Sequence, residues 1–520
     1  MKRSTACASC ALIALAGSTM ALAGSSITES EILLPTGVAH DDSYGWSVAM
    51  DGDDIAIGAP LANIVGPNSG SVTVLNGTDV QVLTPAGSGN WDSFGYSVDI
   101  DCDLLIAGST IHPVATREGA AYVYRRQADG IWAEEAILLA PDGAYSDYFG
   151  CAVAIDGDLA VVGAFLADSS GPSTGAAYVF SYDGGSWSVK QQLSPDEATL
   201  KFGASVAVAG DTILVGSPRD NLNGISAGGA YIFELEGGAW TQQARLVPGD
   251  IQAYDYFGYA VDLDHTGCQA VIGAIFDDSA APNAGAAYVY RRSRGDDDDD
   301  DDDDDDGDDD DGDDDDGDDD DGDDDDGDDD DGDDDDGDDD DGDDDDGDDD
   351  DGDDSWFEQE QLVPSGAEAW QKFGSSVSID GDWAAIGAYG YPDSAGHGYI
   401  YQATEGGWVE SVKLVSSNGI NGARVGYAAA ISGTRALLGA PWQQPDGAAS
   451  TAGSGYLYDL VRAMPHGDSN RDGQVDVLDI LDVLATWGDC PTRPAPCNGD
   501  INRNGRTEVM DLLAILTEMN

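Results

Sequence analysis

Two segments near the end of the chain carry oxygen-bearing side chains at alternating positions. They span residues 468–479 and 500–511, and each has glycine at its sixth position. Alternating oxygen ligands, a glycine for the sharp turn and a carboxylate at position 12 are the requirements of a calcium loop. The sequence therefore predicts two bound Ca²⁺ ions. Their predicted ligands, at positions 1, 3, 5, 7, 9 and 12, are Asp468, Asn470, Asp472, Gln474, Asp476 and Asp479, then Asp500, Asn502, Asn504, Arg506, Glu508 and Asp511.

An apolar segment follows each loop, at residues 477–487 and 509–519, and we expect both to be short helices. This order of two EF-hand-type loops and two helices resembles a dockerin domain over residues 461–520. The resemblance implies a small α-helical domain that binds a cohesin in a calcium-dependent way. Type I dockerins commonly have Ser-Thr at positions 10 and 11, where this chain has Val477-Leu478 and Val509-Met510. The partner is therefore left open between a cohesin, another protein with a hydrophobic surface, and the rest of this chain.

The elements before these loops repeat seven times. A glycine, preceded by an aromatic residue in six copies, stands at Gly45, Gly95, Gly150, Gly203, Gly258, Gly374 and Gly426. The spacing is 50–55 residues except for one interval of 116, which falls to 56 when a 60-residue aspartate and glycine tract is left out. A repeat of this length indicates an array of identical structural units.

Each copy contains four short alternating apolar runs separated by turn residues. In the third copy the runs are 148–155, 159–165, 175–182 and 187–195, and Asp156-Gly157-Asp158 separates the first two. Such runs predict a four-stranded antiparallel sheet, and no copy has a helical period. Seven sheets of this kind stack around an axis, so the sequence predicts an all-β fold, a seven-bladed β-propeller over residues 24–460.

The two ends of the repeat array complement one another. The last copy has only three runs, whereas residues 27–35 match the fourth run of other copies, so we expect them to complete the seventh blade. The array resembles the FG-GAP repeats of the integrin α propeller, with Phe-Gly at Gly95, Gly150, Gly203, Gly258 and Gly374. Some integrin blades carry a DxDxDG calcium loop. No complete version occurs here, so Asp156-Gly157-Asp158 and its equivalents are predicted to be hairpin turns.

The aspartate tract, residues 295–354, is predicted to be a disordered insertion in the outer hairpin of the blade that starts near residue 257. It supplies 49 of the negative charges in a chain of formal charge −82. Such a run repels itself and has no apolar groups to bury. Two interpretations stay open: a low-affinity binder of calcium or cationic surfaces, and expansion of a simple repeat that an exposed loop tolerates.

Composition and targeting signals restrict the class of protein. A charge of −82 excludes nucleic acid as a partner. Residues 1–23 have the basic start, apolar middle and small-x-small end of a signal peptide, so we expect a secreted or cell-surface protein with no membrane span. Cys490 and Cys497 lie close enough in the sequence to pair, and Cys102, Cys151 and Cys268 are predicted to be single thiols.

No residue pattern points to catalysis, and five single histidines form no known motif. Tryptophans that follow the blade period are predicted to open outer strands; they are Trp132, Trp187, Trp240, Trp356 and Trp408. Trp91 and Trp442 fall outside this position and are candidates for surface contact. The leading hypothesis is a secreted non-catalytic adhesion or scaffold protein. Its propeller binds a protein or carbohydrate, and its last domain docks through calcium. The alternative is a component of a secreted polysaccharide-degrading system with glycoside hydrolase or lyase activity.

Overall fold

The computed structural model describes most of residues 26–460 and two short strands beyond them. The described ranges are 26–35, 42–111, 118–197, 199–293, 355–390, 395–404, 406–444, 451–460, 488–489 and 506–507. The predicted signal peptide, the aspartate tract, both predicted helices, the Cys490–Cys497 pair and every predicted calcium ligand except Arg506 lie outside these ranges.

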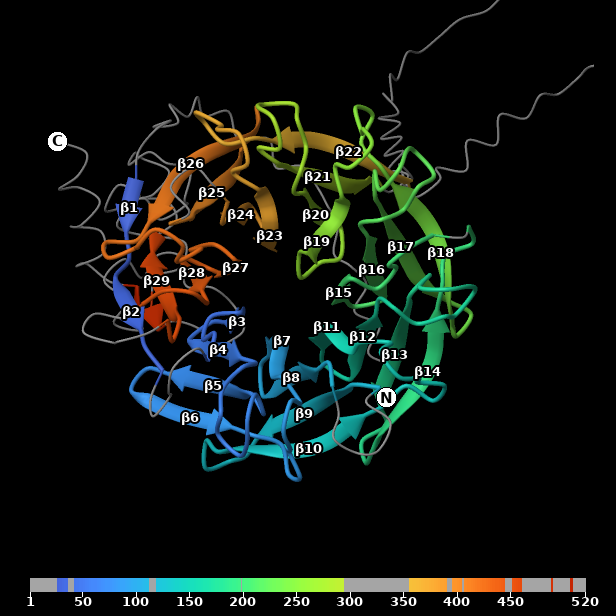
Figure 1. The fold of residues 1–520 in the computed structure, drawn as a ribbon, viewed down its shortest axis with the longest axis vertical. Coiled ribbons are helices and arrows are strands. Elements are labelled where there is room, and N and C mark those ends of the chain that lie inside the picture. The colour runs from blue at the N-terminus through green and yellow to red at the C-terminus, as the bar shows by residue number, and fades with distance from the viewer. Residues whose placement is uncertain are drawn as a thin grey trace, which may run out of the picture. The chain divides into compact units, whose positions relative to one another are not determined.

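Seven sheets of antiparallel strands are arranged around a common axis (Figure 1). The first three blades are β3 (Ser47–Asp51), β4 (Asp54–Ala59), β5 (Ser71–Asn76) and β6 (Asp79–Leu83); β7 (Phe94–Asp101), β8 (Leu104–Ser109), β9 (Ala120–Arg126) and β10 (Trp132–Leu138); and β11 (Phe149–Asp156), β12 (Leu159–Ala164), β13 (Ala176–Tyr182) and β14 (Trp187–Leu193). The fourth and fifth are β15 (Ser205–Ala209), β16 (Thr212–Ser217), β17 (Gly229–Glu236) and β18 (Ala239–Leu246); and β19 (Phe257–Leu263), β20 (Gln269–Ala274), β21 (Ala286–Ser293) and β22 (Ser355–Leu362).

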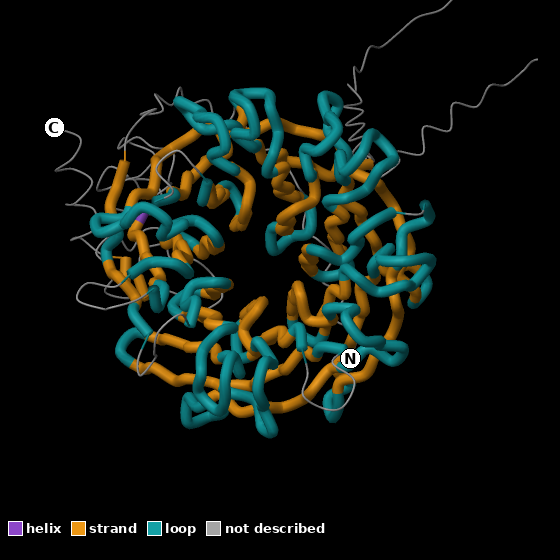
Figure 2. Tube along the Cα trace, viewed as in Figure 1, coloured by secondary structure: helices purple, strands orange, loops and turns teal. Residues whose placement is uncertain are grey.

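The sixth blade is formed by β23 (Phe373–Asp380), β24 (Trp383–Ala388), β25 (His397–Thr404) and β26 (Gly407–Val415). The seventh begins with β27 (Ala428–Ser432), β28 (Arg435–Ala440) and β29 (Ser454–Asp459). The first strand of each blade lies innermost, and strands and loops alternate through all seven blades (Figure 2). No α-helix occurs in the described ranges. The predicted seven-bladed, all-β propeller of four-stranded antiparallel blades is therefore confirmed.

The start of the chain closes the ring, but over a shorter segment than the sequence predicts. Strand β2 (Glu31–Leu33) pairs antiparallel with β29 and supplies the fourth strand of the seventh blade. Strand β1 (Ser26–Thr28) instead pairs parallel with β26, and its Ile27 lies opposite Leu414. The expectation that residues 27–35 all belong to the seventh blade is thus wrong for Ile27 and Thr28, which lie in a fifth strand of the sixth blade. The chain passes from one sheet to the next within a few residues, because β1 has only three residues and a bend at Ser30 separates it from β2.

The repeated glycines hold neighbouring blades at very short distance. Gly58 lies near the end of β4, and a Cβ atom added there would lie 2.1 Å from the backbone oxygen of Gly95 in the next blade. Beside Gly95, the fully buried Phe94 packs edge-on against Tyr122, with ring centroids 5.5 Å apart. The same contact joins Phe149 and Tyr178. The Phe-Gly motif therefore pairs a large buried ring with a backbone contact that no side chain could occupy.

The outer strands carry the tryptophans that follow the blade period. Trp132, Trp240 and Trp408 are buried, which confirms their structural role, and Trp187 and Trp356 are half-buried. The aspartate tract falls between β21 and β22, which are neighbours in the fifth blade. At the ends of these two strands, the Ser293 hydroxyl donates a 3.0 Å hydrogen bond to the Ser355 carbonyl.

Candidate functional site

The innermost strands present two different chemistries at their two ends. In β7, the aromatic-glycine motif stands at the start and an aspartate ends the strand at a tight turn. Tyr96 and Asp101 are separated by five residues, which in an extended strand is roughly 17 Å. The start end and the turn end of these strands are therefore separate surfaces.

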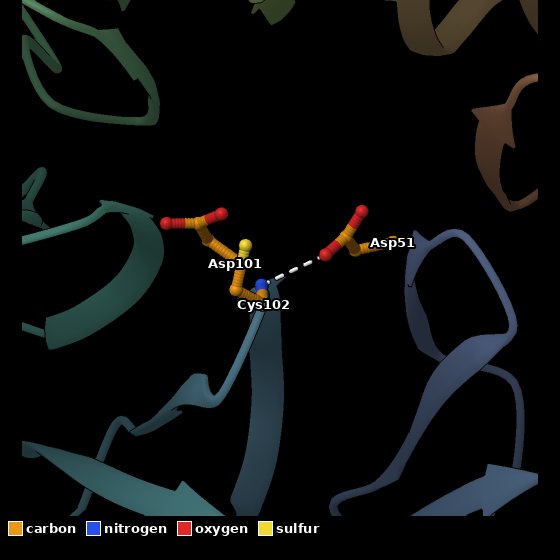
Figure 3. A group of neighbouring side chains, drawn as sticks. All are labelled: Asp51, Asp101 and Cys102. Carbon is orange, nitrogen blue, oxygen red and sulfur yellow. Dashed lines mark hydrogen bonds between the residues drawn. The ribbon is translucent and has the colours of Figure 1, made fainter. Parts of the chain in front are cut away.

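At the turn end, Asp51, Asp101 and Cys102 form a group whose potential ligand atoms all lie within 4.8 Å of one another (Figure 3). The Cys102 backbone amide donates a 2.8 Å hydrogen bond to the Asp51 carboxylate of the preceding blade. Burial raises the pKa of the Cys102 thiol to about 12, and its hydrogen bond with Asp101 adds to this rise. The thiol is therefore protonated at neutral pH when no metal is bound.

The same hydrogen bond recurs around the ring, which gives this group a structural explanation. The carboxylate that ends one innermost strand accepts the amide of the turn in the next blade. The distances are 2.7 Å from Gly157 to Asp101, 2.6 Å from Gly210 to Asp156 and 2.6 Å from Gly433 to Asp380. In the seventh blade Ser432 accepts from Gly52 at 2.9 Å. We call these contacts the turn latch, and they account for Asp51 and Asp101 without a bound ion.

At the start end, aromatic and cationic side chains from all seven blades form a circle that we call the belt. They stand just before the motif aromatic, just after the motif glycine, or one to two residues beyond the second strand of a blade. Its members are Trp46, Tyr96, Tyr148, Phe165, Lys201, Arg219, Tyr256, Tyr259, Phe276, Lys372, Tyr389, Arg424, Tyr427 and Trp442. Arg219 and Arg424 are exposed, Tyr389 is buried and the others are half-buried.

Each belt cation lies over at least one aromatic ring. The Arg424 guanidinium is 4.2 Å from the ring centroid of Trp442, and the Lys372 ammonium is 4.7 Å from that of Tyr389. Lys201 lies 4.8 Å from the Phe165 ring, and Arg219 lies 5.6 Å from the Tyr256 ring. These are cation–π distances, so the rings hold the cations in place without neutralising their charge.

Ring–ring contacts continue the belt through the seventh, first and second blades. Trp46 packs against Trp442, Tyr427 and Tyr96, with centroid distances of 5.6, 4.9 and 5.5 Å. Burial raises the pKa of Tyr96 to about 12, so its hydroxyl stays neutral and available for hydrogen bonding. The belt can therefore offer flat apolar faces, hydroxyl donors and positive charges to one ligand.

The acidic residues next to the belt in the sequence are turned away from it. Asp147 precedes Tyr148 and accepts a 2.7 Å hydrogen bond from the Ala144 amide, and Asp255 precedes Tyr256 and accepts one of 2.6 Å from Gln252. Both carboxyls are buried, and burial raises the pKa of Asp255 to about 7. They cap their own loops and carry less negative charge than exposed carboxylates would.

Sequence reasoning found one member of the belt and one residue near it. Trp442, predicted as a surface contact residue, is half-buried under Arg424, and Trp91 is 54% exposed in the loop before β7. The cations were missed, although the repeat contains a signal for them. The residue before the motif position is a cation in three of the seven copies, at Lys201, Lys372 and Arg424. Arg219 stands at a different position, beyond the second strand of its blade. Of the predicted calcium ligands only Arg506 is described, in β31 (Arg506–Thr507), which pairs with β30 (Gly488–Asp489).

Comparison with known families agrees with this geometry. A family model described as FG-GAP repeat matches seven segments of the chain, at residues 27–75, 78–124, 132–180, 187–233, 240–290, 356–401 and 408–458. The chain belongs to the FG-GAP repeat family. The last five matched FG-GAP repeats begin in the outer strand of one blade and end in the third strand of the next, so the repeat and the blade are offset by one strand.

No curated protein matches this FG-GAP chain significantly. Among the described residues, no helix has the length and apolar character needed to cross a membrane.

Proposed function

We propose that this FG-GAP protein is a secreted, non-catalytic adhesion or scaffold protein that binds an extracellular protein or carbohydrate through the belt. The belt carries the proposal because it gathers aromatic and cationic side chains from every blade at one end of the innermost strands. Elsewhere the large aromatic residues of the motifs are buried between blades, where they stabilise the fold. Aromatic residues and arginine are the side chains that contribute most to binding energy at interfaces.

The second part of the proposal concerns the end of the chain. We propose that residues 461–520 bind two Ca²⁺ ions and dock onto a cohesin-like or other protein. The support is the spacing of oxygen-bearing residues in the two loops, with glycine at the sixth position of each. Because calcium would order both loops, docking is expected to depend on calcium. Secretion is supported by the signal sequence at residues 1–23.

The propeller part is tested with the immobilised full chain and a panel of extracellular matrix proteins and of neutral and charged polysaccharides. We expect at least one class to be retained, and we expect Trp442→Ala to weaken retention about tenfold or more. Trp187→Ala, which removes a half-buried tryptophan from outer strand β14, is the matched control. Retention that Trp442→Ala leaves unchanged would contradict the proposal. Reducing sugar released from the panel would favour the polysaccharide-degrading alternative instead.

The calcium part is tested by titrating the full chain with Ca²⁺ in a calorimeter. We expect two tight sites, distinguishable from weak binding of many ions by the aspartate tract. Asp468→Ala should remove one tight site, and Asp468→Ala combined with Asp500→Ala should remove both and leave the weak phase. If the double variant keeps the tight phase, the two loops are not the calcium sites.

A further inference from the structure

The charges of the belt cations are not neutralised by the protein. Lys201, Arg219, Lys372 and Arg424 form no ion pair with any acidic side chain that the structure describes. Five arginines elsewhere in the blades are ion-paired, for example Arg245 with Asp220 at 2.9 Å. In a chain with 103 acidic and 21 basic residues, four cations without a carboxylate partner on one surface are unexpected.

Two of these cations also act on each other. Burial lowers the pKa of Lys201, and the positive charge of nearby Arg219 lowers it further. Neighbouring positive charges stabilise an anion that binds beside them.

Exposed rings in the neighbouring loops extend the apolar part of this surface. Trp91, Tyr254 and Trp370 stand three residues before the motif phenylalanine of their blades and are 54, 56 and 51% exposed. Each has a positive φ, of 72, 76 and 66°. Their backbone amides donate hydrogen bonds of 2.8–2.9 Å to loops of the preceding blade, at Pro67, Ile225 and Pro282. These bulky rings are thus exposed to solvent, and their backbone has a positive φ that such residues rarely adopt.

We propose that the belt binds an anionic polysaccharide, and this inference rests on the proposed function and names its ligand class. A sugar residue that carries a carboxylate or sulfate has an apolar C–H face and an anionic group. The face would stack on the belt rings, and the anion would pair with a neighbouring cation such as Arg424, whose planar guanidinium suits two oxygens. Belt residues recur from blade to blade, so a polymer can make several such contacts at once.

The test measures binding of the full chain to soluble polysaccharides at 150 mM salt with a chelator, so that calcium does not contribute. Alginate and polygalacturonate supply carboxylates, κ-carrageenan supplies sulfates, dextran is neutral, and poly-L-glutamate is an acidic peptide. We expect the carboxylated or the sulfated polymers to bind, and the difference between these arms identifies the anion. Dextran and poly-L-glutamate should bind at least about tenfold more weakly.

Arg219→Ala combined with Arg424→Ala should reduce binding of the preferred polysaccharide about tenfold or more, because both exposed cations are lost. The matched control, Lys190→Ala with Lys413→Ala, removes the same charge from outer strands β14 and β26 and should leave binding unchanged. Lysine at both positions, Arg219→Lys with Arg424→Lys, should retain part of the affinity. Since Arg219 and Arg424 are exposed, both arginine variants should have wild-type melting temperatures, which excludes misfolding as the cause.

Three results would overturn the inference. They are equal binding of poly-L-glutamate, unchanged polysaccharide binding after loss of both arginines, and no binding of any anionic polysaccharide. If the last result comes with retention of a protein or neutral glycan that Trp442→Ala abolishes, the ligand class is wrong while the proposed binding function stands.

Discussion

At the scale of single residues, one position of the turn latch departs from the repeat. The turn that joins the first two strands of a blade places its central residue in the left-handed region, where Gly52 and Gly157 have φ of 55 and 53°. The second blade has Cys102 at this position, with φ of 54°. A Cβ atom in that conformation costs about 1 kcal/mol. Cys102 is therefore a local source of strain, and its amide contact with Asp51 needs no side chain.

Cys102→Gly is expected to raise the free energy of unfolding by roughly 0.5–1 kcal/mol, because glycine adopts a positive φ without strain. The reverse change, Gly157→Ala, should lower it by about 1 kcal/mol. A Cβ atom at Gly157 would meet no atom within 4 Å, so the expected loss of stability comes only from the backbone conformation and not from a steric clash. Urea unfolding measures both values. A Cys102→Gly variant that is less stable than the wild type would mean that the thiol has a role which the latch does not explain.

At the scale of elements, neighbouring innermost strands are joined through side-chain acceptors as well as by packing. Within β7, Asp99 accepts the Ile155 amide of the next blade at 2.8 Å, and in β19 Asp262 accepts the Ile379 amide at 2.9 Å. Ser378 is their equivalent in β23 and accepts from Ile431 at 3.2 Å. Burial raises the pKa of Asp99 to about 8 and that of Asp262 to about 7. In both strands, folding thus favours the protonated form of a buried carboxyl group.

This shift makes stability depend on pH with a definite sign. Because the folded-state pKa of Asp99 lies above the unfolded value near 4, folding binds a proton between these values. The stabilisation is complete below about pH 4 and is lost as the pH rises to about 8. Asp99→Ser, which copies Ser378, should therefore gain stability relative to the wild type by at least about 1 kcal/mol between pH 4 and pH 8.

The measurement is the urea midpoint of both proteins at several pH values, and Asp262→Ser provides an independent case with the same expected sign. If the wild type and both variants change in parallel with pH, these carboxyls ionise in the folded state as they do in the unfolded chain.

The sequence allowed local elements to be predicted better than contacts between them. Strands, turns and their order follow from alternation and turn residues, which lie within about ten residues of one another. The role of Asp51 and Asp156 as acceptors for the next blade depends on a neighbour about fifty residues away. The belt depends in the same way on rings and cations that meet only after the blades assemble, such as Arg424 and Tyr389. The parallel pairing of β1 involves three residues and has no periodic signal.

At the scale of the whole molecule, the ring depends on one short strand from the start of the chain. Strand β2 contributes the buried Leu33, which packs in a cluster with Tyr44, Ile57 and Leu457 and so joins the first and seventh blades. Next to it, the Ser30 hydroxyl and amide both donate to the Leu457 carbonyl, at 3.0 and 2.8 Å. Without β2, the outer edge of β29 would be open and the two ends of the ring would be joined by fewer contacts.

Leu33→Ala is therefore expected to lower the free energy of unfolding by about 2–4 kcal/mol, the usual cost of removing a buried leucine. Leu34→Ala is the matched control, since Leu34 is adjacent but 48% exposed, and it should cost less than about 1 kcal/mol. Tryptophan fluorescence during urea unfolding measures the midpoint of both variants. If closure by β2 joins the first and seventh blades, Leu33→Ala lowers the midpoint relative to Leu34→Ala, whereas equal midpoints for the two variants would show that the ring is stable without this strand.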